Sequence, residues 1–138
     1  LDDYSECLRL AGGRYEIFFG RDELLLTGLS LGAKSAVGST YNFAAPLYHK
    51  TARLHSLGRT ADAEEWQALC TTAIEIMIRC GGLSAIRTTM RFCGFDCGPM
   101  RLPLRAINES TATVLHKELI DLGFFDRLEQ ARAELSHS

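Results

Sequence analysis

The sequence contains no long apolar run, no excess of positive charge and no apolar leader at its start. No stretch approaches the roughly 20 apolar residues that a membrane-spanning helix requires. The formal net charge of −2 gives no reason to expect nucleic acid or a membrane surface as a partner. The chain begins Leu1-Asp2-Asp3-Tyr4, which is too polar for a signal peptide and lacks a starting methionine. We therefore expect a cytoplasmic protein whose chain is processed, truncated or given in part.

Cysteine is sparse and its count is odd, which argues against a disulfide framework. The chain has five cysteines, and Cys93 and Cys97 form a C-x3-C pair with no histidine near them. The spacing leaves a zinc site open, but free thiols in a reducing compartment are the expectation, with no bound metal.

Polar groups follow two short β-type runs at the point where each run ends in glycine. The first run, Tyr15–Phe19, leads into Gly20-Arg21-Asp22-Glu23, and the second, Ser35–Gly38, leads into Ser39-Thr40-Tyr41-Asn42. A helical pattern follows each run, which predicts parallel strands. In parallel α/β folds, ligands bind at the C-terminal ends of the strands. The pair therefore predicts a small-molecule site.

The first 58 residues alternate between helical and strand patterns. Two short strands cannot form a stable parallel sheet alone, because parallel strands need neighbours on their edges and cover on both faces. The chain must therefore pair with another copy or be the C-terminal piece of a longer β/α protein. The helical patterns here cover residues 2–11, 22–31 and 44–57.

Beyond Gly58 every pattern is helical. Thr60 is the expected N-cap of a long helix whose apolar positions recur at i, i+3 and i+4 and include Trp66 and Ile78. We therefore divide the chain into a partial α/β region over residues 1–58 and an all-helical region over residues 59–138. The expected helices cover residues 60–79, 83–93, 110–122 and 124–135.

Several of these elements resemble one enzyme family. Gly20-Arg21-Asp22-Glu23, then Gly32-Ala33, then Gly38-Ser39-Thr40-Tyr41-Asn42 resemble the N-acetylneuraminate lyase branch of the pyruvate-dependent class I aldolases. That superfamily includes dihydrodipicolinate synthase. Gly98-Pro99-Met100-Arg101-Leu102-Pro103-Leu104 resembles the Gly-Pro-x-Arg-x-Pro element of the helical region of the same family. The resemblance covers the whole chain in the right order.

The resemblance implies an α/β fold, the C-terminal part of a (β/α)8 TIM barrel followed by an all-helical C-terminal region. Tyr15–Phe19 would be the seventh strand and Ser35–Gly38 the eighth, so residues 1–58 would hold the last two β/α units. The implied reaction is the aldol cleavage of a sialic acid to N-acetylmannosamine and pyruvate through a lysine Schiff base, with no metal and no external cofactor. In the family that lysine lies on the sixth strand and the acid/base tyrosine on the fifth, upstream of this chain.

The resemblance also assigns substrate binding to Gly20, Asp22, Glu23, Gly38 and Ser39. The carboxylates and the hydroxyl would bind the polyol part of the sugar acid, and the glycines would let the backbone approach it. A simpler interpretation stays open for each residue. Asp22 would cap a helix, Glu23 would be favoured by the helix dipole, and Ser39 and the glycines would only form turns.

The chain has only three lysines, and none fits a Schiff-base role. Lys34 precedes the second strand and so lies at the wrong end of it, whereas Lys50 and Lys117 lie on amphipathic helices. A Schiff-base lysine needs a lowered pKa in a desolvated pocket at the C-terminal end of a strand. We therefore assign no catalytic residue to this chain and expect it to be inactive alone.

Two alternatives remain. Another pyruvate-dependent aldolase, such as dihydrodipicolinate synthase, is the first, although Ser39-Thr40-Tyr41-Asn42 argues against it. The second is a non-catalytic fragment that associates with itself through its exposed strand edges. For the lyase and for both alternatives we expect a homo-oligomer. For the lyase and the other aldolase we also expect a small-molecule substrate.

Overall fold

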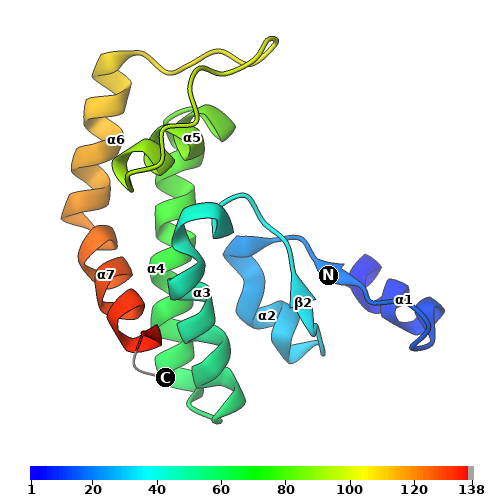
Figure 1. Cartoon of the computed structure of the whole chain (residues 1–138). Coiled ribbons are helices and arrows are strands. Elements are labelled where there is room, and N and C mark those ends of the chain that lie inside the picture. The colour runs from blue at the N-terminus through cyan, green and yellow to red at the C-terminus, as the bar shows by residue number, and fades with distance from the viewer. Residues whose placement is uncertain (137–138) are drawn as a thin grey trace.

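The computed structural model describes residues 1–136, so His137 and Ser138, the last two residues of the expected helical region, lie outside the described part. A small parallel sheet with one projecting helix adjoins a bundle of longer helices (Figure 1). In chain order the elements are α1 (Asp2–Ala11), β1 (Phe18–Phe19), the 3-10 helix η1 (Asp22–Leu24), α2 (Leu25–Ser30), β2 (Ser35–Ala36), α3 (Tyr41–Ser56), α4 (Thr60–Arg79), α5 (Leu83–Phe92), α6 (Glu109–Asp121) and α7 (Phe124–Leu135).

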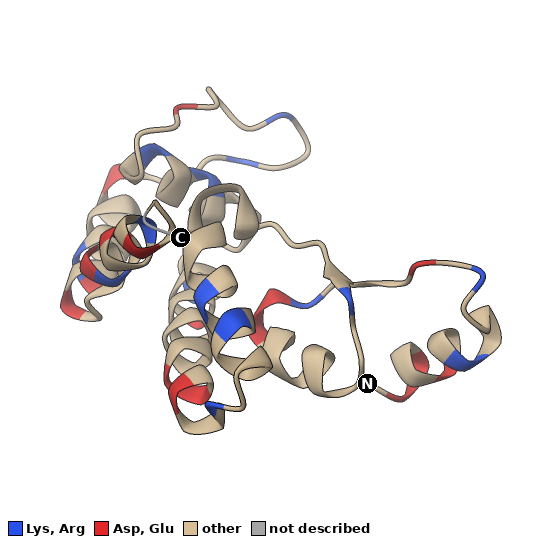
Figure 2. Ribbon diagram, turned by 60° about the horizontal axis from the view of Figure 1, so that its bottom comes forward, with Lys and Arg blue, Asp and Glu red and all other residues tan. Residues whose placement is uncertain are grey.

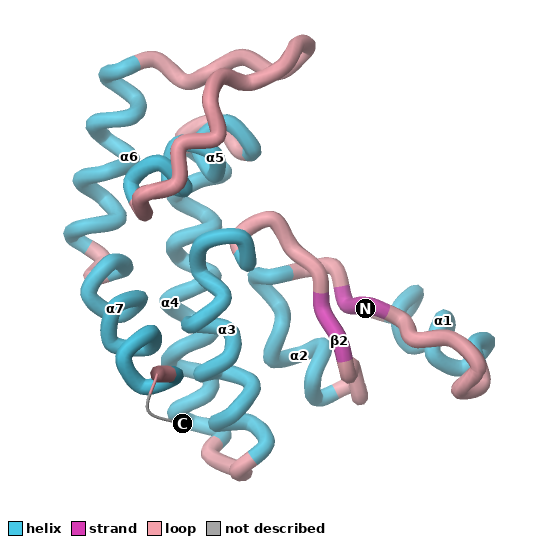
Figure 3. The backbone as a smooth tube through the Cα atoms, in the orientation of Figure 1, coloured by secondary structure: helices cyan, strands magenta, loops and turns pink. Residues whose placement is uncertain are grey.

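The two strands pair in parallel, as the helix-strand alternation predicts. Phe18 lies opposite Ser35 and Phe19 opposite Ala36, and residues 60–135 contribute no strand (Figure 3). The strands are shorter than expected, because Tyr15–Ile17 and residues 37–38 lie outside them. The described residues add no further strand on either outer edge, so pairing is limited to the end of the first run and the start of the second.

One face of the sheet is covered by α2 and the other is open. Phe19 is buried, and its ring packs so closely on Gly28 of α2 that a Cβ at Gly28 would lie 2.6 Å from it. Phe18, in contrast, is 54% exposed and Val37 is 59% exposed. Burial of apolar surface is the main favourable contribution to folding, so this open face is unusual for two adjoining strands.

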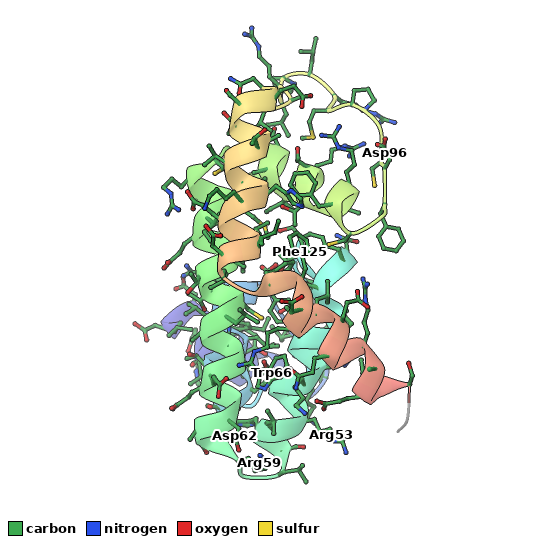
Figure 4. The ribbon with its side chains drawn as sticks, turned by 90° about the vertical axis from the view of Figure 1, so that its left-hand side faces the viewer. Arg53, Arg59, Asp62, Trp66, Asp96 and Phe125 are labelled. Carbon is green, nitrogen blue, oxygen red and sulfur yellow. The ribbon has the colours of Figure 1, made fainter. Side chains whose placement is uncertain are left out.

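The core lies between α3, α4, α6 and α7. α4 runs through its centre, and Trp66 and Met77 of this helix are buried, as the spacing predicts. Trp66 points toward α7, where the Arg127 guanidinium lies 4.6 Å from the ring centroid (Figure 4). The expectation for Ile78 is wrong, since this side chain is 62% exposed. The buried cluster also includes Leu25, so the sheet-side helix and the bundle share one core.

The helix ends differ in part from those expected. α4 begins at Thr60 itself with Arg59 at the N-cap position and no side-chain cap, so the expectation for Thr60 is wrong. Asn108 caps α6 instead, where its Oδ1 accepts a hydrogen bond from the Thr111 N–H at 2.8 Å. α3 begins at Tyr41, three residues earlier than expected. The early start follows from Thr40, whose carbonyl accepts the first backbone hydrogen bonds of the helix.

α1 projects from the rest of the molecule (Figures 1 and 3). Its Tyr4 hydroxyl donates to the carbonyl oxygen of Ile17 at 3.1 Å, and the Tyr4 ring packs edge-on against Phe19 with 5.0 Å between centroids. Leu10, on the same helix, is 63% exposed. α1 is thus attached chiefly through one aromatic side chain.

Within the described residues no helix by itself has the length and apolar character to cross a membrane, although α4 and α5 together have sufficient length and apolar composition across a bend of 117°. Acidic and basic residues are interspersed along the helices (Figure 2).

Candidate functional site

The residues that follow β1 and β2 meet at one edge of the sheet. A buried carboxylate joins them. Asp22, at the start of η1, accepts two hydrogen bonds on Oδ2, from the Thr40 N–H at 2.9 Å and from the Thr40 hydroxyl at 2.5 Å. Asp22 is 8% exposed and Thr40 is 2% exposed. This carboxylate therefore ties the end of one strand to the end of the other, and it does not cap a helix.

Gly38 is required by this tie. A Cβ at residue 38 would lie 2.6 Å from Cγ of Asp22 and 2.7 Å from its Oδ2, closer than real contacts allow. Gly20 is different, since a Cβ there would meet nothing within 4 Å. The two strand-ending glycines thus have separate roles. Gly38 lets the Asp22 carboxylate approach the backbone, whereas Gly20 leaves open space at the strand end.

The hydrogen bonds between Asp22 and Thr40 continue toward the core through a second buried hydroxyl group. The Thr40 hydroxyl lies 2.6 Å from the Tyr48 hydroxyl of α3. Burial raises the pKa of Tyr48, and burial likewise raises the pKa of the Cys70 thiol beside it to about 12. These groups therefore stay neutral at ordinary pH, and the Asp22 carboxylate has neutral donors around it.

Tyr41 packs against Tyr48, but its hydroxyl has no partner. The Tyr41 and Tyr48 rings meet edge-on with 4.4 Å between centroids. The Tyr41 hydroxyl is buried and makes no hydrogen bond with any described residue, and burial raises its pKa. The ring lines a cavity of about 360 Å³ between α2, β2 and α3, which Ser35 and His49 also line.

Three of the five residues assigned to substrate binding, Gly20, Glu23 and Ser39, are not used in the hydrogen bonds between Asp22 and Thr40. Glu23 is held by Arg21, whose Nε and Nη2 donate to its Oε1 at 3.0 and 2.8 Å. The Ser39 hydroxyl makes no hydrogen bond within residues 1–136, and Gly20 is exposed. Glu23 and Ser39 are the sequence neighbours of the tied pair, Asp22 and Thr40. The hydrogen bonds between Asp22 and Thr40 therefore hold the two segments that carry Glu23 and Ser39 at the same edge of the sheet.

Four contributors to the site are absent from the sequence-based assignment. Thr40 and Tyr48 complete the tie, and Gln67 and Thr71 of α4 hydrogen-bond the backbone of η1. Gln67 carries a weak signal, since it is a polar residue between apolar positions of α4. Thr40 also carries a signal, since it belongs to the polar run after the second strand. Tyr48 and Thr71 carry none, because their partners lie 8 and 48 residues away in the sequence.

None of the lysines provides a reactive amine at this edge. Lys34 is exposed and directly precedes β2, at the opposite end of that strand. Lys50 pairs with Glu134, and Lys117 with Asp121, which raises the pKa of Lys117. Residues 1–136 also contain no group of three metal-ligating side chains, and all five cysteines are free.

Comparison with known proteins gives consistent matches. The sequence pattern of the dihydrodipicolinate synthetase family matches residues 1–121. The N-acetylneuraminate lyase of Rhizobium meliloti is 30% identical over 101 residues, which is 73% of this chain and 34% of that protein. The N-acetylneuraminate lyase of Rattus norvegicus is 31% identical over 88% of this chain and 39% of its own length. The 4-hydroxy-tetrahydrodipicolinate synthase of Clostridium perfringens (strain SM101) is 27% identical over 86% of this chain and 41% of its own.

Solved structures agree with the fold. The N-acetylneuraminate lyase from Aliivibrio salmonicida superimposes with a TM-score of 0.82 at 30% identity, covering 89% of this chain and 41% of that one. A 2-keto-3-deoxygluconate aldolase from Sulfolobus solfataricus gives the same TM-score at 23% identity, covering 94% and 43%. These neighbours are TIM-barrel aldolases. The chain thus spans about two fifths of the length of these neighbours.

Proposed function

The chain belongs to the dihydrodipicolinate synthetase family, and on that basis we propose that it is part of an aldolase that cleaves N-acetylneuraminate to N-acetylmannosamine and pyruvate. In this proposal β1 and β2 are the seventh and eighth strands of the barrel, and residues 59–138 form the appended helical region. The relatives named N-acetylneuraminate lyase, at 30 and 31% identity, support this substrate over that of the synthase, at 27%.

The tie between Asp22 and Thr40 is the observation that carries the proposal. It fixes two strand ends relative to each other. In this proposal Glu23 and Ser39 direct a carboxylate and a hydroxyl toward the substrate from that edge. A carboxylate accepts hydrogen bonds from sugar hydroxyls, and a serine hydroxyl both donates and accepts. Gly20, which has no side chain, would let the protein backbone approach the substrate. Together these groups suit a polyol chain better than a small apolar aldehyde.

The reactive amine comes from outside residues 1–138 in this proposal. In a class I aldolase an amine forms an imine with the keto carbon, releases water, and accepts the electron pair when the carbon–carbon bond breaks. Lys50 and Lys117 are ion-paired, and Lys34 lies at the wrong strand end. The contribution of this chain is therefore to bind and orient the polyol end of the substrate.

The test is to measure the steady-state kinetics of the natural protein, as its host produces it, and of its Glu23→Ala and Ser39→Ala variants. Loss of one hydrogen-bonding partner costs about 1–3 kcal/mol, so kcat/KM for N-acetylneuraminate should fall roughly tenfold to a hundredfold. Pyruvate binding should not change. Glu64→Ala, at an exposed position of α4, is the matched control. Unchanged kinetics in both variants would contradict the proposal, and pyruvate use without N-acetylneuraminate cleavage would favour another pyruvate-dependent aldolase.

A further inference from the structure

Two polar residues of α4 hold the backbone of the turn that follows β1. Gln67 Nε2 donates to the carbonyl oxygen of Asp22 at 3.2 Å, and Gln67 Oε1 accepts from the Leu26 N–H at 3.0 Å. One helical turn further on, the Thr71 hydroxyl donates to the carbonyl oxygen of Glu23 at 2.9 Å. The Gln67 carbonyl, 3.0 Å from the same hydroxyl, competes for that hydrogen. The two side chains therefore hold the backbone of η1 at Asp22 and Glu23 and the first turn of α2 at Leu26.

These hydrogen bonds matter because apolar packing does not fill the space beside them. A hollow of about 570 Å³ lies between α4 and the η1–α2 segment, and Glu23, Leu26, Gln67 and Thr71 all line it. Gln67 is 9% exposed, and a buried amide is costly to leave without partners. The polar contacts thus help to fix the position of the turn relative to α4, together with the buried Leu25 side chain that follows the turn.

One of these hydrogen bonds holds the backbone of Glu23, whose carboxylate binds the substrate in the proposed function. Glu23 is bonded to Thr71 through its carbonyl and to Arg21 through its side chain. A shift of its backbone therefore moves the carboxylate relative to Ser39 on the neighbouring strand end. We infer that Gln67 and Thr71 are positioning residues that determine which hydroxyl of the sugar-acid chain forms a hydrogen bond with Glu23. This inference rests on the proposed function.

The experiment compares Thr71→Val with Thr72→Val in the protein as its natural host makes it. Valine replaces the hydroxyl by a methyl of similar shape, and Thr72 is the exposed neighbour with no hydrogen bond among the described residues. Thr71→Ser restores the hydroxyl. Hydrogen–deuterium exchange of residues 22–26 is measured first, without substrate, and we expect faster exchange in Thr71→Val alone.

Kinetics then test the effect on specificity. The ratio of kcat/KM for N-acetylneuraminate to that for the shorter 2-keto-3-deoxygluconate should fall roughly twofold to tenfold in Thr71→Val. Thr71→Ser and Thr72→Val should keep the original ratio.

Unchanged exchange in Thr71→Val would overturn the positioning role whatever the substrate is. Faster exchange with an unchanged ratio would overturn the effect on specificity. If the unsubstituted protein does not cleave N-acetylneuraminate, the proposed function fails, and with it the assignment of a sugar hydroxyl to Glu23; the exchange measurement still decides whether α4 holds the turn.

Discussion

At the scale of single residues, the two strand-ending glycines look alike in the sequence but have different surroundings. Gly38 faces the Asp22 carboxyl at a distance that excludes a Cβ, and Asp22 cannot retreat without losing its bonds to Thr40. Gly20 faces open space. The difference separates a glycine that the packing requires from one where a side chain would meet no neighbour.

Gly38→Ala should therefore destabilise the protein by about 1–3 kcal/mol, as overpacking does. Gly20→Ala should leave the free energy of unfolding within about 0.5 kcal/mol of the original value, as surface substitutions usually do. Urea unfolding followed by circular dichroism measures both. Equal losses of stability in the two variants would show that the close approach of Gly38 to Asp22 is not as described.

The two tyrosines of α3 provide a second contrast. Tyr48 shares a hydrogen bond with Thr40, whereas the buried Tyr41 hydroxyl has no partner among residues 1–136. In the natural protein, Tyr48→Phe should cost about 0.5–1.5 kcal/mol, because it removes the buried hydrogen bond between the Tyr48 and Thr40 hydroxyls while Thr40 keeps its bond to Asp22. Tyr41→Phe should be neutral or stabilise by up to about 1 kcal/mol, because it removes an unsatisfied group. Thermal unfolding of both variants decides between these outcomes, and a larger loss for Tyr41→Phe would contradict them.

At the scale of elements, local sequence predicts the helices well and the strands less well. α4 and α7 match the expected ranges because the periodicity of buried residues such as Trp66 and Leu128 is itself the cause of their packing. The strands are too long in the prediction because strand length depends on neighbours that the local sequence does not contain. The parallel direction of the strands follows from the alternation of strands and helices, and the structure confirms it.

What local sequence could not predict is how the site is held together. Asp22 has the sequence signature of a helix cap, yet its carboxylate bonds Thr40, 18 residues away. Gln67 and Thr71 act on η1 across more than 40 residues. Such contacts depend on tertiary packing, so no pattern within one element reports them. The assignment of the five substrate residues and the division of the chain at residue 58 stay predictions.

Helix capping gives a test at this scale. Asn108→Ala should destabilise the protein by about 0.5–2 kcal/mol, because Asn108 Oδ1 satisfies the Thr111 N–H at the start of α6. Thr60→Ala is the matched control, since Thr60 lies at the start of α4 but provides no side-chain cap. Chemical unfolding of both variants measures the difference. A loss for Thr60→Ala as large as that for Asn108→Ala would contradict this account of the helix starts.

At the scale of the whole molecule, the described residues leave large apolar side chains without cover. Phe18 and Val37 lie exposed on the sheet, Tyr15 is 69% exposed before β1, and α1 projects away from the bundle. A typical soluble domain buries such groups, so we expect this face and the open strand edges to be covered by other segments, either of the same protein or of another copy.

The 138-residue chain alone should therefore form oligomers or aggregate. Sedimentation velocity at several concentrations measures this, and the expected result is a mean mass that rises with concentration. Phe18→Ser and Val37→Ser together should reduce the association. A monomer that unfolds cooperatively at every concentration would contradict the view that the open sheet face needs a partner.

The most direct test of the central claim is trapping of the Schiff base. The protein as its natural host makes it is incubated with pyruvate and borohydride, and the modified residue is located by mass spectrometry. The 138-residue chain is treated in parallel. We predict one reduced adduct per natural protein, at a lysine other than Lys34, Lys50 and Lys117, and none on the 138-residue chain. A stoichiometric adduct on one of these three lysines, or no adduct on the natural protein, would contradict the claim.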